Sequence, residues 1–174
     1  MKNKLSLIFL ILCFSLIIHQ SNADNLKIVF VDMDKIIATS NAGKKIQDSL
    51  DKFANKENQK FDKTESELKK KEQEILKQKN IISKEELDKK VKSFQEELTK
   101  LRNDKVNFNR SIIKKNKEAT NKMVNAINKI LTKYAADNSV SLIIQKKNII
   151  IGKSDMDITT QILKEFNNQV KSVN

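Results

Sequence analysis

Apolar residues recur at alternating spacings of four and three between residues 87 and 112, the heptad pattern of a helix that packs along a partner helix. This hydrophobic seam is interrupted by a single lysine, and its positions are Leu87, Val91, Phe94, Leu98, Leu101, Lys105, Phe108 and Ile112. A thinner stripe precedes it, formed by Ile46, Leu50, Phe53, Phe61, Leu68 and Ile75. The pattern predicts two long helices, of which the first has the smaller apolar face.

A short break separates the two helical patterns at residues 80–83. Asn80 suits the left-handed backbone conformation that ends many helices, and Ser83 with Glu86 forms a capping box that opens the next helix. Because so short a connection cannot return the chain to a parallel start, the two helices must run antiparallel. We therefore predict an α-helical coiled-coil hairpin over residues 44–134, called the arm below, with its turn near residues 80–83.

Shorter elements flank the arm on both sides. The alternating sequence LKIVFV at residues 26–31 predicts a strand with Leu26, Ile28 and Phe30 on one face. A short helix is expected over residues 34–40, and residues 41–43 are expected to break the pattern before the arm begins at Lys44. After the arm, residues 140–144 and 148–151 predict a hairpin of two strands. Asp157 is then expected to cap a short final helix with apolar residues Ile158, Ile162, Leu163 and Phe166.

The flanking segments, residues 24–43 and 135–174, are expected to form one β-rich unit, called the body below. About 60 residues bury too little apolar surface to be securely stable alone, and their strand edges would stay open. We therefore expect several chains to share a sheet or barrel from which the arms project. The predicted fold class is α+β, and the residues expected in the shared body are Ile28, Phe30, Leu142, Ile144, Ile149 and Ile151.

The first 23 residues have the pattern of a cleavable secretory signal. Lys2 and Lys4 precede an apolar run at residues 5–18, and small residues precede a predicted cut after Ala23. An uncleaved anchor is the alternative, although the run is short for a bilayer span. The chain's one Cys and one His both lie in this segment. The mature chain therefore excludes disulfides, a histidine base and the usual zinc ligands, and we expect no catalytic residue, cofactor or metal, and no enzyme.

The positive charge of the mature chain is concentrated on the arm. The formal net charge of +12 falls to +10 when the signal, which contains two lysines, is removed. Residues 44–133 contain 25 basic and 15 acidic side chains, whereas the body has seven of each. Favourable pairs four residues apart explain part of this charge, among them Glu65 with Lys69, Glu67 with Lys71, Glu85 with Lys89, Glu86 with Lys90 and Glu96 with Lys100.

The surplus that remains favours attraction to anionic partners. Candidate anion-binding residues are Lys100, Arg102, Arg110, Lys114, Lys115, Lys117 and Lys122. Nucleic acid is not expected as a partner, because only two of the mature chain's basic residues are Arg, aromatic residues are not interleaved with them, and the signal directs the chain out of the cytoplasm. Anionic lipid, lipopolysaccharide and acidic unfolded polypeptides fit that compartment better.

Six apolar residues of the arm lie outside the seam: Leu76, Ile81, Ile82, Val106, Ile113 and Leu131. In one interpretation they widen the contact between the two helices and cover the turn. In the other they form scattered, weakly adhesive patches that hold unfolded chains loosely. The second interpretation makes candidate binding residues of Leu76, Ile81, Ile82, Val106 and Ile113.

Both ends of the mature chain resemble the Skp/OmpH family. The likeness at the start rests on Val31-Asp32, Ile36-Ile37, Ser40, Ala42-Gly43-Lys44, Leu50 and Phe53, and at the end on residues 140–144 and Asp157-Ile158-Thr159. It implies a periplasmic, ATP-independent holdase chaperone, a homotrimer whose β-barrel body bears three helical tentacles around a cavity for unfolded outer-membrane proteins. The resemblance does not assign a client-binding role to any individual residue of this chain. The alternatives are an envelope protein that binds anionic membrane or lipopolysaccharide, and a structural coiled-coil spacer.

Overall fold

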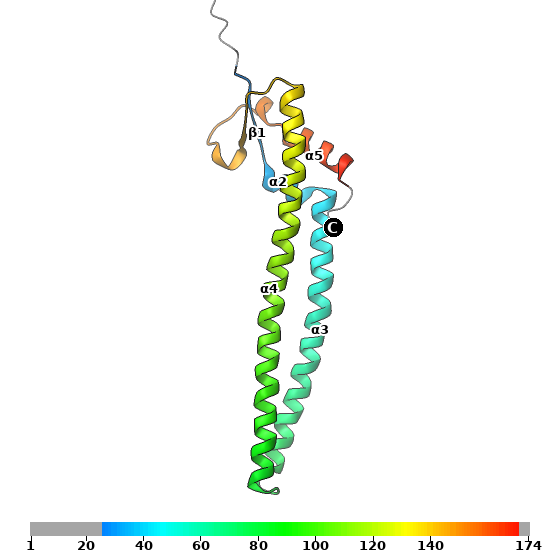
Figure 1. Cartoon of the computed structure of the whole chain (residues 1–174), viewed down its shortest axis with the longest axis vertical. Coiled ribbons are helices and arrows are strands. Elements are labelled where there is room, and N and C mark those ends of the chain that lie inside the picture. The colour runs from blue at the N-terminus through cyan, green and yellow to red at the C-terminus, as the bar shows by residue number, and fades with distance from the viewer. Residues whose placement is uncertain (1–25, 171–174) are drawn as a thin grey trace, which may run out of the picture.

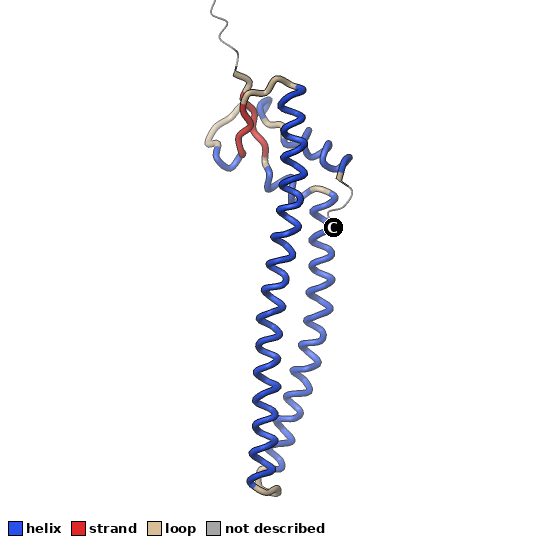
Figure 2. Tube along the Cα trace, in the orientation of Figure 1, coloured by secondary structure: helices blue, strands red, loops and turns tan. Residues whose placement is uncertain are grey.

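The computed structural model describes residues 26–170, which are mostly helical with a small two-stranded sheet near one end (Figure 1). Helices α3 (Asn41–Gln78) and α4 (Lys84–Asp137) lie side by side and run in opposite directions, joined at the end far from the sheet (Figure 2). The 54 residues of α4 reach about 80 Å at 1.5 Å per residue. Because α3 has 38 residues, α4 extends past its start into the body.

The connection at the tip of the arm begins and ends close to the predicted break. Ser83 caps α4 as the sequence indicates, with its side chain accepting a hydrogen bond from Glu86 N. The prediction for Asn80 was wrong, because Ser139 is the only non-glycine residue with positive φ in the described range 26–170. The amides of Ile81 and Ile82 instead donate to the carbonyl of Gln78, at 2.9 and 3.1 Å, which closes the turn with ordinary backbone angles.

The seam packs between the two helices, and its members differ in depth. Leu68 of α3 and Leu101 of α4 are buried, whereas the other apolar seam residues of the outer arm are half-buried. Phe108 lies between two phenylalanines of α3, with ring centroids 5.5 Å from Phe53 and 5.6 Å from Phe61. Two helices alone cannot cover more of these side chains, so the arm has a narrow and partly open hydrophobic contact.

Strands β1 (Ile28–Val31) and β2 (Leu142–Gln145) form a parallel pair in which Ile28 lies opposite Leu142 and Phe30 opposite Ile144. The predicted hairpin of two strands after the arm was therefore wrong. The 3-10 helix η1 (Lys146–Asn148) follows β2 directly, and residues 149–153 form no strand. The sequence there lacks the Asn-Gly type of turn that a tight hairpin favours. β2 instead pairs with β1 from the other end of the chain.

Helix α2 (Met33–Thr39) follows β1 and is capped by Asp32, whose side chain accepts from Lys35 N at 2.9 Å. The long helix then begins at Asn41 and not at Lys44, so the predicted break at residues 41–43 was wrong. Ser40 caps α3 by accepting from Gly43 N at 3.1 Å, and it is fully buried. Gly43 therefore lies in the first turn of α3, with its amide bonded to the side chain of Ser40.

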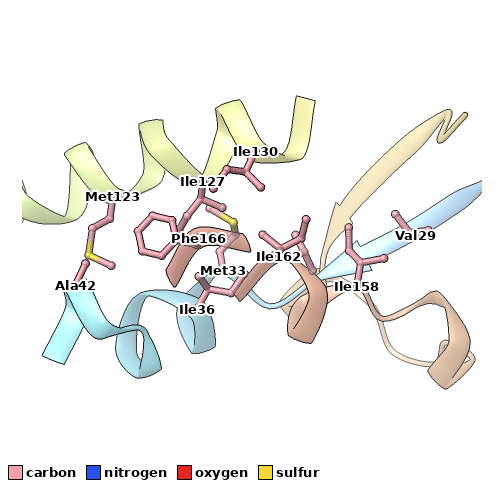
Figure 3. Close-up of a cluster of buried hydrophobic side chains, with 11 residues drawn as sticks. Val29, Met33, Ile36, Ala42, Met123, Ile127, Ile130, Ile158, Ile162 and Phe166 are labelled. Carbon is pink, nitrogen blue, oxygen red and sulfur yellow. The ribbon is translucent and has the colours of Figure 1, made fainter. Parts of the chain in front are cut away.

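The body core is built by helices from both ends of the chain around one face of β1 (Figure 3). Val29 and Val31 are the strand's contribution, so the face with Ile28 and Phe30 lies outside this cluster. Phe166 of helix α5 (Thr159–Gln169) is fully buried with Ile36 of α2 and Ile127 of α4. The last turns of α4 therefore serve the body as well as the arm.

The segment before α5 differs in detail from the prediction. The 3-10 helix η2 (Ser154–Met156) precedes it, and Ile158 rather than Asp157 occupies the capping position. Asp157 nevertheless accepts a hydrogen bond from Thr159 N at 3.0 Å. Thr159 is buried and its hydroxyl accepts from Asp32 N at 2.9 Å, so this short network joins α5 to the end of β1.

Candidate functional site on the arm

The basic residues singled out from the sequence all lie exposed on α4. Lys100 donates to Asp104 at 2.7 Å, and Lys114 lies 3.9 Å from Glu118. The ammonium of Lys115 lies 5.3 Å from the ring centroid of Phe53. The seven residues are spread over about six helical turns, so they form an extended positive surface and do not converge on one ligand.

Two ion pairs cross the arm and join α3 to α4. Lys105 donates to Glu65 at 2.6 Å, and Lys71 donates to Glu97. The hydrogen bonds from Lys71 and then Ser93 hold the pKa of the Glu97 carboxyl below its usual value. Near the tip, Lys90 donates to Gln78 at 2.7 Å. Among the pairs expected four residues apart, Lys71, Lys90 and Lys100 are thus engaged elsewhere, so those expectations were wrong.

The apolar residues outside the seam divide into two groups. Ile81 at the tip is 80% exposed, Ile113 is 68% exposed, Leu76 is 65% exposed and Val106 is 47% exposed. Ile82 is half-buried, and Leu131 packs against the body core. Leu131 is therefore a structural residue, whereas the four exposed side chains are scattered along the arm and remain available to a partner.

A groove between α3 and α4, which the sequence did not indicate, opens beside the aromatic residues of the seam. Its volume is about 620 Å³, and Phe53, Phe61 and Phe108 line it together with the buried Leu101. We call it the aromatic groove. Polar residues of both helices complete its lining: Glu57, Lys60, Thr64, Glu97, Lys100, Asp104, Asn107 and Ser111. The feature of the sequence that corresponds to the groove is Glu57, a polar residue midway between Phe53 and Phe61 in the apolar stripe of the first helix.

The residues expected in a shared body occupy different depths. Phe30 is 6% exposed within its own chain, with the Lys146 ammonium 5.8 Å from its ring centroid. Ile28, Ile144 and Ile149 are half-buried, whereas Leu142 and Ile151 are exposed. Ile150, which the sequence did not single out, is 99% exposed beside Ile151 at 91%. The body thus presents an apolar surface next to the sheet.

Residues 26–170 contain neither a cluster of potential metal ligands nor a helix that could span a membrane. No group of three or more potential metal ligands lies together in this part of the chain. No helix within it is long and apolar enough to cross a membrane. The predicted signal segment and its cut after Ala23 lie outside the described residues.

Comparison with known proteins gives a family and a related fold. A family model described as outer membrane protein (OmpH-like) matches residues 27–166. A crystal structure of a candidate outer membrane chaperone (OmpH-like) from Caulobacter crescentus CB15 superposes with a TM-score of 0.80 at 12% sequence identity, over 86% of this chain and 88% of that one. No curated protein matches the sequence. The family match confirms the resemblance seen at both ends of the mature chain, and the chain belongs to the family of OmpH-like outer membrane proteins.

Proposed function

We propose that the protein is an ATP-independent holdase chaperone of the periplasm, which binds unfolded outer-membrane proteins and prevents their aggregation. The observation that carries this proposal is the family match over residues 27–166. The Caulobacter protein with the similar fold is described as a candidate outer membrane chaperone, which supports the same function. An unfolded outer-membrane protein is called the client below.

The surface of the arm supports a two-step mechanism. The positive surface of α4 attracts acidic client segments over a distance, because the charges along it exceed those that are paired. Exposed apolar residues such as Ile81 and Ile113 then hold the client by weak contacts. Folding of the client into the outer membrane would release it, so nucleotide hydrolysis is not required.

The apolar surface beside the sheet supports assembly into a homotrimer through the body. Exposed Ile150 and Ile151 and the open edge of β2 are costly in a monomer. Packing of three bodies into a shared barrel would cover them and project three arms around one cavity. The segment before residue 24 has two lysines ahead of an apolar run, and as a cleaved signal it would place this assembly in the periplasm.

The test is light scattering of an outer-membrane β-barrel protein diluted from urea, with and without the mature protein. We expect suppression of aggregation together with a defined complex that contains about three copies of the chain by mass measurement. Unhindered aggregation would contradict the proposal. Binding to anionic vesicles without any client would then identify an adhesive envelope protein, and rigid arms without either activity would identify a spacer.

A further inference from the structure

We propose that the aromatic groove binds one aromatic side chain of a client at a time. This inference rests on the proposed function and adds a defined contact to it, because the exposed apolar residues elsewhere on the arm are scattered. The groove's volume of about 620 Å³ lies within the range of sites that hold small ligands. It is therefore large enough for a side chain and a short length of backbone.

The groove is open on one side of the aromatic cluster and closed on another. The Lys105 ammonium lies 5.7 Å from the ring centroid of Phe61, and that of Lys115 lies 5.3 Å from Phe53. Neither lysine lines the groove, although both rings do. The lysines thus occupy one approach to the rings, and the groove is the approach that no side chain of the arm fills.

The geometry of the rings favours an aromatic occupant over an aliphatic one. Phe53 and Phe61 are inclined to Phe108 by 54° and 68°, with centroids 5.5 and 5.6 Å away. Aromatic rings prefer tilted and edge-to-face contacts over this range of distances. A fourth ring in the groove can extend this arrangement, whereas a branched aliphatic side chain gains only contact area.

The charges around the groove favour an uncharged occupant. Each carboxylate of its lining already has a basic partner: Glu57 contacts Lys60 at 2.6 Å, Asp104 contacts Lys100 at 2.7 Å, and Glu97 contacts Lys71. The groove therefore presents no unpaired charge to a phosphate or a carboxylate. This separates it from the positive surface around Lys114 and Lys117, which is suited to anions.

Binding of a tryptophan probe tests the inference directly. The probe is a blocked, uncharged glycine and serine peptide with one central Trp. The chain itself contains no Trp and a single Tyr, so fluorescence excited selectively in tryptophan reports only the probe. We expect a saturable blue shift. A matched peptide with Leu in place of Trp, added as a competitor, should bind at least fivefold more weakly.

Two substitutions fill the groove without removing a phenylalanine. Ser111→Leu fills it from α4 and Thr64→Leu fills it from α3. Each should weaken probe binding at least fivefold while the helical circular dichroism and the unfolding temperature are retained. Asn109→Leu is the control, because Asn109 is exposed on the same helix as Ser111 and does not line the groove; its affinity for the probe should equal that of the wild type.

Two results would overturn the inference: wild-type affinity in both filled variants, or an equal loss in the Asn109→Leu control, which would show that the loss does not depend on filling the groove. The aggregation assay on the same preparations separates this failure from that of the proposed function. Suppression of aggregation without probe binding rejects the groove alone. Probe binding in the groove without suppression rejects the holdase function and leaves the groove as a site for aromatic groups.

Discussion

Lys105 of α4 occupies a position of the hydrophobic seam, yet its ammonium donates across the arm to Glu65 of α3 at 2.6 Å. The same ammonium lies 5.7 Å from the ring centroid of Phe61. The two side chains of the pair are 40% and 52% exposed. An ion pair this exposed contributes about 0.2 to 1 kcal/mol at most, and the position of the ammonium near the Phe61 ring is a second contact of the same side chain.

Replacement of Lys105 by Leu should therefore stabilise the arm. The variant restores the apolar seam, and partial burial of a leucine contributes about 1 to 1.5 kcal/mol, which exceeds the loss of the exposed ion pair. We expect the free energy of unfolding to rise by about 0.5 kcal/mol, measured by thermal unfolding at one fixed protein concentration. Lys105→Gln is the control and should not stabilise. A larger loss for Leu than for Gln would show that the ion pair dominates.

Gly43 should not tolerate the substitution that usually stabilises a helix. Ala in place of Gly inside a helix is ordinarily favourable by about 1 kcal/mol. A Cβ on Gly43, however, would lie 1.8 Å from the carbonyl oxygen of Ile37, a backbone atom that cannot move alone. We expect Gly43→Ala to lower the free energy of unfolding by about 2 kcal/mol or more, measured by urea unfolding.

The control for this substitution is Ser49→Ala, at an exposed position of the same helix. It should be neutral or stabilising by a few tenths of a kcal/mol, as the helix propensities of Ser and Ala indicate (about 0.5 kcal/mol). Equal stability of Gly43→Ala and Ser49→Ala would contradict the close approach of α2 to the start of α3.

The sequence predicted the arm well because its information is local. Ser83 caps α4, and the spacing from Leu87 to Ile112 places the seam between the helices. The partner of Lys105 could not be predicted in the same way, because it depends on the register between α3 and α4. For the same reason the expected pair of Glu67 with Lys71 was wrong: Lys71 reaches Glu97 on the other helix, and a sequence separation of 26 residues gives no local signal.

The body was predicted less well, because its contacts join the two ends of the chain. The run at residues 148–151 has the composition of a strand, but β2 pairs in parallel with β1, and no strand partner remains for it in the described chain. The aromatic groove was missed for a related reason. It arises where Phe53 and Phe61 of one helix meet Phe108 of the other, and neither helix contains it alone.

Asp157 should make the stability of the body depend on acidic pH. Burial raises the pKa of its carboxyl, but the hydrogen bonds from Lys146 and Thr159 outweigh burial and hold the pKa below the usual 3.8. A carboxyl group whose pKa is lowered by folding stabilises the folded state at pH values above its pKa in the unfolded chain. This stabilisation is lost as the pH falls through the pKa of the folded state. The stabilisation from Asp157 is therefore complete at neutral pH, begins to fall near the unfolded pKa of about 3.9, and is lost only when the pH has fallen through the lower folded pKa.

Asp157→Asn is the variant that measures this contribution. We expect it to unfold at a lower temperature than the wild type at pH 7, and the difference should shrink as the pH falls from about 4 through the lowered pKa of the folded state. Thermal unfolding at a series of pH values provides the measurement. A difference that stays constant over this range would show that Asp157 acts through its shape and not through its charge.

The positive surface of α4 should affect the rate at which clients are captured more than the affinity with which they are held. Lys117 is exposed, Lys114 has its nearest carboxylate 3.9 Å away on Glu118, and Lys115 lies over Phe53. Replacement of all three by Gln should slow capture about two- to fivefold at low salt, because steering by surface charge accelerates association. Stopped-flow fluorescence with a labelled client measures the rate.

A matched variant decides whether position or total charge matters. Lys147, Lys153 and Lys164 are exposed on the body, and their replacement by Gln changes the net charge by the same amount as the substitutions on α4. We expect this control to capture clients at nearly the wild-type rate, and the deficit of the α4 variant to vanish at about 0.5 M salt, where the screening length falls to about 4 Å. Equal slowing of both variants would show that only the net charge attracts the client. A deficit of the α4 variant that persists in high salt would show that these lysines act by direct contact and not by long-range attraction.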